Sequence, residues 1–353
     1  MSRPAPISHS SPDVGEQEIR AAIECLRSQH LKGGKRMRDL EEQVAHDLGY
    51  LGAVATTSCT QALHLALRVM SRGDGAEVGL PSYVCRSVYD AIRLAKDRPR
   101  LLDIDPGYLS VSLAQARRLR LKAVIVPHMF GIRAPIEDFM NAGLRVIEDC
   151  AQRLTPPEVA RMEPKAPLRV LSFEATKLLT CGEGGLLLCD HIQLLERARR
   201  LRDGQHDSTG SSLWIAMTDL QAAIALVQWR RLPSLLKRRR RLAADYIEAL
   251  GLKFTDRIVP AMRAKDTYHF RFVLRSYNPV AFMERTFEEG VITRRPVAPA
   301  PLHRLLKDRR RFPTTQEAFD HLVSIPLYPR LTSAEAERVA STTTAALARD
   351  SAQ

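Results

Sequence analysis

Polar residues follow several short apolar segments in the first half of the chain, and some of them are residue types that can do chemistry. Lys177 follows the segment RVLSF in SFEATK, with few other charges nearby. A lysine shielded from water there is a Schiff-base candidate, although a lone loop lysine is usually a solvated charge. Asp149 ends another apolar segment, LRVIED. Its carboxylate can pair with a cationic ring nitrogen or cap the next helix, and the residue alone does not decide between these.

A third candidate is the segment Ser58, Cys59 and Thr60, which opens a predicted helix after AVAT. Backbone N–H groups, hydroxyls and the helix dipole suit a phosphate at such a start. Taken alone, the segment is more simply explained as an ordinary Ser/Thr helix cap. A Schiff-base lysine, a buried aspartate and a helix-start phosphate site are together what pyridoxal phosphate (PLP) requires. The combination therefore predicts a PLP site more specifically than any of its parts.

The elements that must position these residues alternate between residues 52 and 192. Short apolar segments (AVAT, EVGL, RLLDI, AVIVPH and LRVIED) are separated by amphipathic stretches, and RVLSF and GLLLC follow as two more strands. This alternation predicts an α/β fold with a mainly parallel sheet covered by helices on both faces. Ligands of such sheets bind outside the carboxyl ends of the strands, and the three candidates all lie at such ends.

Helical patterns flank this region on both sides. One helix is expected from a cap at Asp13 to about residue 28, another over 37–46, and three more over 191–202, 217–230 and 233–249, with Pro233 beginning the last. Beyond about residue 250 the pattern changes to a strand (269–276), a helix (279–289) and a final helix from about 333. We therefore expect a large domain with an N-terminal helical arm over 1–230 and a smaller C-terminal domain over 231–353.

The composition excludes several classes of protein. Hydrophobic residues make up 45% and charged residues 26% of the 353 residues, as in ordinary soluble proteins. No apolar run approaches the roughly 20 residues that cross a bilayer, and the start lacks a secretory apolar segment, so a cytoplasmic protein is expected. The six cysteines have no metal-ligand spacing, so neither a metal site nor a disulfide framework is expected.

The net charge of +13 is the unusual feature, and it comes from arginine-rich runs dispersed along the chain. Solvated faces of amphipathic helices explain these runs best, and attraction of phosphorylated small substrates is the second explanation. Nucleic-acid binding is not expected, because the sequence contains no groove-reading motif.

The motifs, in their order, resemble the DegT/StrS family of PLP-dependent sugar aminotransferases. The resemblance extends nearly end to end, through TTSCTQALHLAL (56–67), VIEDCAQ (146–152), SFEATKLLTCGEGG (172–185), MTDLQAA (217–223) and SIPLYPRLT (324–332). It implies the aspartate aminotransferase type of fold (fold type I), with a mainly parallel seven-stranded sheet sandwiched by helices and a smaller α+β C-terminal domain. It also implies a homodimer with active sites at the subunit interface.

The resemblance also assigns roles to residues. Lys177 becomes the lysine that forms the Schiff base with PLP and moves protons, Asp149 the partner of the pyridine nitrogen, and Gln152 a neighbour of the ring hydroxyl. Phosphate binding falls to Thr60, the Cys59 amide and Ser172, and Glu183 lies in a turn near the catalytic pocket. The implied reaction takes an amino group from an amino acid, by analogy glutamate, to a keto sugar or related metabolite.

The sequence departs from the family pattern at three places. Cys85 occupies the position of the cofactor-binding aromatic ring, so stacking on the cofactor must come from Tyr83 or Tyr89, or be absent. In SLWIAM (212–217), Trp214 and Ala216 replace an Asn and an Arg, and the Asn reaches the phosphate bound by the neighbouring subunit. Cys59 replaces a glycine. These changes indicate a divergent subgroup with an altered acceptor.

The sequence leaves two other functions open. The first is a dehydratase or lyase that uses PLP or its pyridoxamine form on the same scaffold, but related dehydratases carry His where Lys177 stands. The second is a non-catalytic regulator that binds nucleic acid through its basic surface. Arg294 and Arg295 are candidates for steering a nucleotide-linked or otherwise phosphorylated acceptor, although solvated loop charges are the commoner explanation. His128 is expected to be a packed structural histidine.

Overall fold

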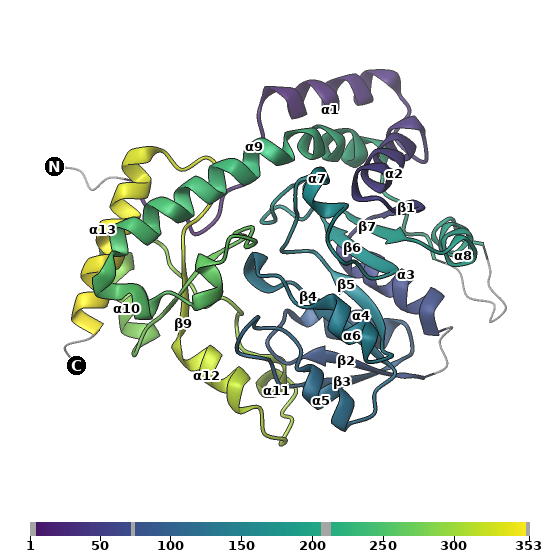
Figure 1. Ribbon diagram of the computed structural model, residues 1–353. Helices are drawn as coiled ribbons and strands as arrows, with labels where there is room; N and C mark the ends of the chain where they lie inside the picture. The colour runs from purple at the N-terminus through teal and green to yellow at the C-terminus, as the bar shows by residue number, and fades with distance from the viewer. Residues whose placement is uncertain (1–4, 72–74, 206–212, 351–353) are drawn as a thin grey trace.

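A seven-stranded sheet forms the centre of the molecule in the computed structural model, which describes residues 5–71, 75–205 and 213–350 (Figure 1). The strand order is β1-β7-β6-β5-β4-β2-β3, and β7 alone runs antiparallel to its neighbours. This confirms the predicted mainly parallel sheet. The strands are β1 (Gly52–Thr56), β2 (Glu77–Pro81), β3 (Arg98–Leu102), β4 (Ala123–Pro127), β5 (Arg145–Asp149), β6 (Leu168–Ser172) and β7 (Gly185–Cys189).

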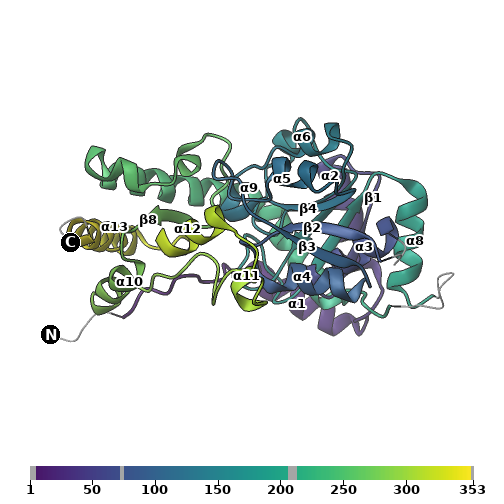
Figure 2. The same cartoon turned by 90° about the horizontal axis from the view of Figure 1, so that it is seen from below.

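Helices cover both faces of this sheet because successive strand residues point to opposite sides. In β1, Val54 packs with α3, whereas Ala53 and Ala55 pack with α2. Figure 2 shows α3 and α4 on one side of the strands and α5 and α6 on the other. The first face carries α3 (Cys59–Ser71), α4 (Arg86–Leu94) and α8 (Ile192–Arg202). The second carries α2 (Lys35–Leu48), α5 (Leu113–Arg118), α6 (Ile136–Asn141) and α7 (Pro157–Ala160).

The long helix α9 (Asp219–Leu250) corrects one sequence prediction. Pro233 was expected to begin a separate helix, but it lies inside this continuous one. A proline there removes one helical hydrogen bond, yet Leu232 and Leu235 on either side both pack in the same core cluster, so burial of the apolar face outweighs the local cost. The predicted domain boundary between residues 230 and 231 lies within α9, and the division of the chain there stays a prediction.

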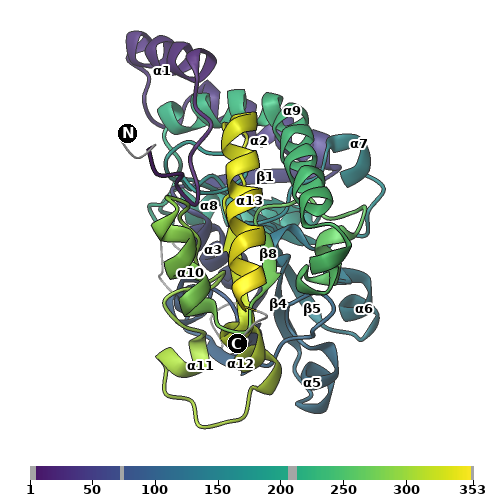
Figure 3. The ribbon, with the colours of Figure 1, turned by 90° about the vertical axis from the view of Figure 1, so that its left-hand side faces the viewer.

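A second, two-stranded antiparallel sheet lies in the C-terminal part of the chain. Its strands are β8 (Phe272–Arg275) and β9 (Leu322–Ile325), and the helices around it are α10 (Pro279–Glu288), α11 (Leu302–Leu305), α12 (Pro313–His321) and α13 (Ser333–Asp350). Three short 3-10 helices complete the elements, at Met129–Gly131, Leu252–Arg257 and Pro260–Arg263. In Figure 3, α13 and α10 face the viewer side by side. The sequence did not predict α12 and β9, which are short and carry no clear periodicity.

The N-terminal segment connects the two parts of the molecule. Ile7 pairs with Val291 beside the second sheet, and the chain then continues into α1 (Glu16–Ser28), which packs on α9. The predicted cap at Asp13 is wrong: the N-cap of α1 is Gly15, whose N–H donates to Glu18 Oε2 at 2.9 Å. Asp13 instead forms an ion pair with Arg231 of α9, which holds the segment against that helix.

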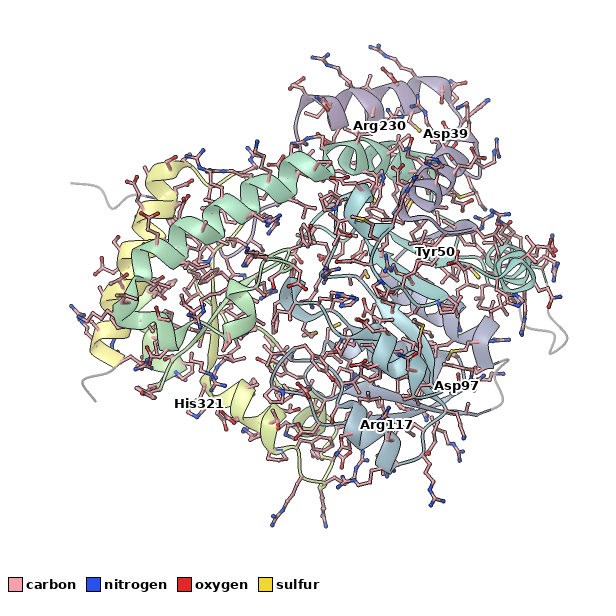
Figure 4. The ribbon with its side chains drawn as sticks, in the orientation of Figure 1. Asp39, Tyr50, Asp97, Arg117, Arg230 and His321 are labelled. Atoms are coloured by element: carbon pink, nitrogen blue, oxygen red, sulfur yellow. The ribbon has the colours of Figure 1, made fainter. Side chains whose placement is uncertain are left out.

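Exposed basic residues are spread over the molecule rather than gathered in one patch. In Figure 4, Arg117 on α5 and Arg230 on α9 lie on different sides. This distribution is what solvated helix faces produce. In the parts of the chain that the structure describes, every helix is too short or too polar to cross a lipid bilayer.

Candidate active site

The predicted site residues lie where the carboxyl ends of β5 and β6 meet the start of α3. Asp149 is the last residue of β5 and Ser172 the last residue of β6. Gly185 of β7 pairs with both Ser172 and Thr56, so one residue links the end of β6 to the loop that leads into α3. A Cβ at Gly185 would lie 2.4 Å from the Ser58 carbonyl oxygen, and only glycine permits this approach.

The start of α3 has the features expected of a phosphate site. The helix begins at Cys59, and the Ser58 hydroxyl accepts a hydrogen bond from the Gln61 N–H at 3.3 Å. The N–H groups of the first turn have no partner within the helix, so those of Cys59 and Thr60 are available to an anion. Thr56 Oγ1 donates to the Ser58 carbonyl at 2.9 Å and holds the loop in this shape.

Asp149 is buried, at 5% exposed, and its carboxylate is only partly satisfied. Oδ1 accepts one hydrogen bond, from the Ala151 N–H at 2.9 Å. Burial raises the pKa of Asp149, while the Ala151 hydrogen bond and the charge of Lys177 oppose the rise. A buried carboxylate with so few partners suits a cationic N–H group supplied by a ligand.

Lys177 lies in the turn after β6, where its N–H donates to the Glu174 carbonyl at 2.9 Å. Its Nζ lies 5.2 Å from the centre of the Phe270 ring, and the residue is half-buried. Burial raises the pKa of the Cys59 thiol, Asp149 and Cys85 add to the rise, and the charge of Lys177 opposes it. Lys177, Asp149, Cys59 and Cys85 therefore lie close enough to interact electrostatically.

Gln152 follows Asp149 by three residues in the chain. Its Oε1 accepts a hydrogen bond at 2.9 Å from the N–H of Phe130, a residue held at a φ of 60°. The amide oxygen is thus used by the protein, which leaves the Nε2 group as the donor end. A donor there suits the ring hydroxyl that the resemblance assigns to Gln152.

Both tyrosines offered for stacking on the cofactor make ring contacts with other residues. Tyr83 is 0% exposed, and its ring meets that of Phe130 edge-on at a centroid distance of 6.1 Å. The Tyr89 ring lies under the guanidinium of Arg86, 5.9 Å from its centre. Cys85 itself is the exposed N-cap of α4, and its assignment to the stacking position stays a prediction.

The three predicted substrate-binding residues, Glu183, Arg294 and Arg295, differ in their surroundings. Glu183 is exposed, but partial desolvation of its carboxyl and the nearby Glu174 raise its pKa, against the charge of Lys177. Arg294 is exposed and pairs with Ser324 through the backbone. Arg295 is half-buried and already donates to the Phe319 carbonyl. Glu183 is thus the one whose charge interacts with Lys177.

The segment that carries Trp214 and Ala216 extends the edge of β1. Ala216 bridges Thr56, and the Thr57 N–H donates to the Ile215 carbonyl at 2.8 Å. Trp214 rests on Gly204 and is 75% exposed. Ser212, at the start of the predicted motif, lies outside the described residues. The sequence did not single out Arg239, which is buried, or Arg271, which is half-buried. Both contact Phe270, whose ring centre lies 5.2 Å from Lys177 Nζ. An arginine inside the apolar segment HFRFVLR was the signal for the second.

Comparison with known proteins identifies the family. The model of the DegT/DnrJ/EryC1/StrS aminotransferase family matches residues 12–344, so the chain belongs to that family. The structure is similar to the aminotransferase TlmJ from Streptoalloteichus hindustanus, at 28% identity and a TM-score of 0.85, over 98% of this chain and 100% of that one.

Two other solved structures share the fold. The putative sugar aminotransferase Spr1654 from Streptococcus pneumoniae, in its PLP form, matches at 21% identity and a TM-score of 0.87, over 98% of this chain and 99% of that one. The sugar aminotransferase CalS13 from Micromonospora echinospora matches at 23% identity and a TM-score of 0.82, over 96% of this chain and 99% of that one. The predicted fold type I is confirmed, and the protein is a PLP-dependent aminotransferase.

The residues present fit the cofactor. The buried, partly satisfied carboxylate of Asp149 matches a pyridinium N–H, and the first turn of α3 offers N–H groups to a phosphate. Lys177 lies within electrostatic reach of both Asp149 and Cys59. The chain therefore carries a lysine, a buried carboxylate and phosphate-binding groups, the three kinds of group that the Schiff base, the ring nitrogen and the phosphate of PLP require.

Proposed function

We propose that this protein transfers an amino group from an amino acid, with glutamate as the expected donor, to a keto sugar or a related keto metabolite in amino-sugar or secondary-metabolite biosynthesis. A keto-sugar acceptor is expected to be nucleotide-linked. The observation that carries the proposal is the meeting of Lys177, Asp149 and the start of α3 at one edge of the sheet. The family membership and the printed functions of the similar structures support the same activity.

Each residue has a stated task in this proposal. PLP supplies the electron sink for the carbanion that forms when the donor loses its α-proton. Lys177 Nζ would take up that proton from the donor carbon and deliver it to the C4′ carbon of the cofactor. Asp149 stays ionised and keeps the ring nitrogen protonated. Gln152 orients the ring through its hydroxyl, while Thr60, Cys59 and Ser172 hold the phosphate and Glu183 lies toward the substrate.

A homodimer is part of the proposal. Ile19, Ile23 and Leu26 form an apolar stripe on the outer face of α1, and each is between 41% and 52% exposed. Such a stripe on a surface helix favours contact with another chain. Sedimentation of the wild type and of Ile23→Asp tests this, because a charge in the stripe should shift the mass toward the monomer. A cytoplasmic location stays a prediction.

The visible absorption spectrum of the purified protein with PLP, before and after glutamate is added, tests the proposed reaction. We expect a band from PLP bound to Lys177 that glutamate converts to the pyridoxamine form. Lys177→Ala should lose both the band and its conversion, whereas Lys253→Ala, a change at an exposed lysine, should keep them. A wild-type protein with no such band at saturating PLP would refute the proposal and favour the non-catalytic alternative.

A further inference from the structure

A glutamine of α9 connects the N-terminal segment to the loop that carries Lys177. Gln228 is 1% exposed, and its Oε1 accepts a hydrogen bond at 3.2 Å from the N–H of Thr180, three residues beyond Lys177. Its Nε2 donates to the Asp13 carbonyl at 2.7 Å and to Glu18 Oε1 at 2.8 Å. We infer that Gln228 is a positioning residue that sets the direction of this loop and thereby the place of the Lys177 amine. The inference rests on the role of Lys177 in the proposed function.

The loop that carries Lys177 is closed at its base. The Phe173 N–H donates to the Gly184 carbonyl at 2.9 Å, and the Cys181 N–H donates to the Phe173 carbonyl at 3.0 Å. The Thr180 hydroxyl donates to the same Phe173 carbonyl at 3.4 Å. Thr180 is therefore joined to the rest of the loop, and a shift of its backbone moves the segment that holds Lys177.

Apolar burial stabilises the loop without setting its direction. Leu178 is 5% exposed and Leu179 is 0% exposed, and both pack in the core cluster that includes Trp229 of α9. The free energy of such contacts depends on buried area and is not directional. A hydrogen bond requires its donor and acceptor to be aligned, so the bond to Gln228 fixes the orientation of the Thr180 peptide group. The two leucines hold the loop in place, and the glutamine orients it.

The N-terminal segment fixes the orientation of the Gln228 side chain. Figure 1 shows α1, which carries Glu18, lying along the outer side of α9. Although burial raises it, the hydrogen bond from Arg231 and weaker ones together hold the pKa of Glu18 below its usual value, so its carboxylate is ionised. An ionised carboxylate and the Asp13 carbonyl can only accept hydrogen bonds. The amide nitrogen of Gln228 must therefore face these two groups, and its oxygen must face Thr180.

A second glutamine of α9 holds the far end of the loop. Gln221 lies seven residues before Gln228, and its Nε2 donates to the Glu183 carbonyl at 2.8 Å. Its Oε1 accepts from the N–H and the hydroxyl of Thr218, the N-cap of α9, at 3.0 and 2.8 Å. Residues seven apart lie on one face of a helix. The helix thus presents both amides to the loop, and Gln228 is the more deeply buried of the two.

Amide hydrogen exchange of the cofactor-free protein tests the contact. We expect exchange in the peptide over residues 178–184 to be about tenfold faster in Gln228→Leu, because the Thr180 N–H loses its acceptor. Gln115→Leu is the matched control, since Gln115 of α5 also accepts from a backbone N–H, that of Asp103 at 2.5 Å. Figures 1 and 3 show α5 well apart from α9, so this variant should leave exchange over 178–184 unchanged.

Turnover and stability should rank two variants in opposite orders. Gln228→Leu has a similar volume and loses the acceptor, whereas Gln228→Glu keeps an oxygen for the Thr180 N–H but brings a second carboxylate against Glu18. We expect kcat to fall about 10- to 100-fold in Gln228→Leu with the KM for glutamate within about threefold, because a displaced amine slows the chemical step more than it weakens binding. Gln228→Glu should retain more of kcat, although two buried like charges make it unfold at a lower denaturant concentration.

These measurements separate the inference from the proposed function. Equal exchange over 178–184 in the wild type and Gln228→Leu overturns the inference. So does a lower kcat in Gln228→Glu than in Gln228→Leu, since turnover would then follow stability, as a merely structural role requires. The PLP band of the wild type with glutamate is recorded first. A wild type without this band refutes the role of Lys177, and the positioning role with it, whatever the exchange rates show.

Discussion

Two neighbouring carboxylates at the end of β5 have opposite environments. Glu148 and Asp149 are both buried, and consecutive strand residues point to opposite faces of the sheet. Glu148 accepts hydrogen bonds from Arg169 Nε and Nη2, both at 2.9 Å, and from the Ala166 N–H at 3.0 Å, and contacts His128 Nε2 at 2.8 Å. The Asp149 carboxylate accepts one, from Ala151. The Glu148 carboxylate thus has a full set of partners within the protein, whereas the Asp149 carboxylate can accept further hydrogen bonds from a ligand. We call these the complete and the incomplete side of the strand.

The pKa values express the same difference. Although burial raises it, Arg169 and His128 together hold the pKa of Glu148 well below its usual value. Burial raises the pKa of Asp149, and its partners do not fully offset that rise. His128, Glu148 and Cys150 have the atom types of a metal site, with ligand atoms within 4.8 Å of one another. The Glu148 oxygens, however, already serve Arg169 and His128, so this group is a structural cluster. Incomplete compensation of a buried charge, rather than burial itself, marks the functional side.

Replacing Glu148, on the complete side, should produce the largest effect on stability. Glu148→Gln leaves the Arg169 charge buried without its partner, so we expect the free energy of unfolding to fall by about 3–5 kcal/mol. Denaturant unfolding of the cofactor-free protein measures this. Glu317→Gln, which removes an exposed partner of Arg275, should change stability by less than about 1 kcal/mol. Equal losses in the two variants would show that the buried Glu148 carboxylate contributes no more to stability than the exposed Glu317 carboxylate.

Replacing Asp149, on the incomplete side, should lower catalytic activity and not stability. Asp149→Asn removes the charge that keeps the cofactor ring protonated, and we expect turnover to fall about 10²- to 10³-fold, or roughly 3–4 kcal/mol of barrier. The cofactor-free variant should unfold at no lower denaturant concentration than the wild type, because a poorly compensated buried charge has been removed. A variant that unfolds early and retains its turnover would assign Asp149 a structural role.

The dependence of stability on pH sharpens the comparison. The pKa of Asp149 is raised on folding, so its protonated form contributes stability that is present below the unfolded pKa, near 4, and is lost as the pH rises through the folded pKa. Cofactor-free Asp149→Asn should therefore gain stability relative to the wild type across this window. Melting temperatures from about pH 4 to pH 8 test this. Glu148 acts in the opposite direction, since its lowered pKa gives stability that is lost as the pH falls.

The sequence predicted those features that depend on local pattern and order. The alternation of apolar segments predicted the sheet, and the residues after the strands predicted Lys177, Asp149 and the start of α3. Pro233 was misplaced because core packing on both sides of it overrides a local preference. Asp13 was misassigned because its partner, Arg231, is distant in sequence. Arg239 and Arg271 could not be recognised, since their contacts with Phe270 arise only in the folded chain.

The smallest effect is expected at Cys85, the predicted stacking position, where an aromatic side chain can be introduced by substitution. Cys85 is exposed at the start of α4, and its neighbours Tyr83 and Tyr89 are engaged with Phe130 and Arg86. Cys85→Trp supplies an aromatic face, so we expect PLP to bind about two- to tenfold more tightly, from roughly 0.5–1.5 kcal/mol of stacking. Titration of the apoprotein with PLP, followed by its visible band, measures the change, with Cys85→Leu as the control for apolar bulk alone. Equal gains in both variants would show that contact area, and not stacking, is what this position lacks.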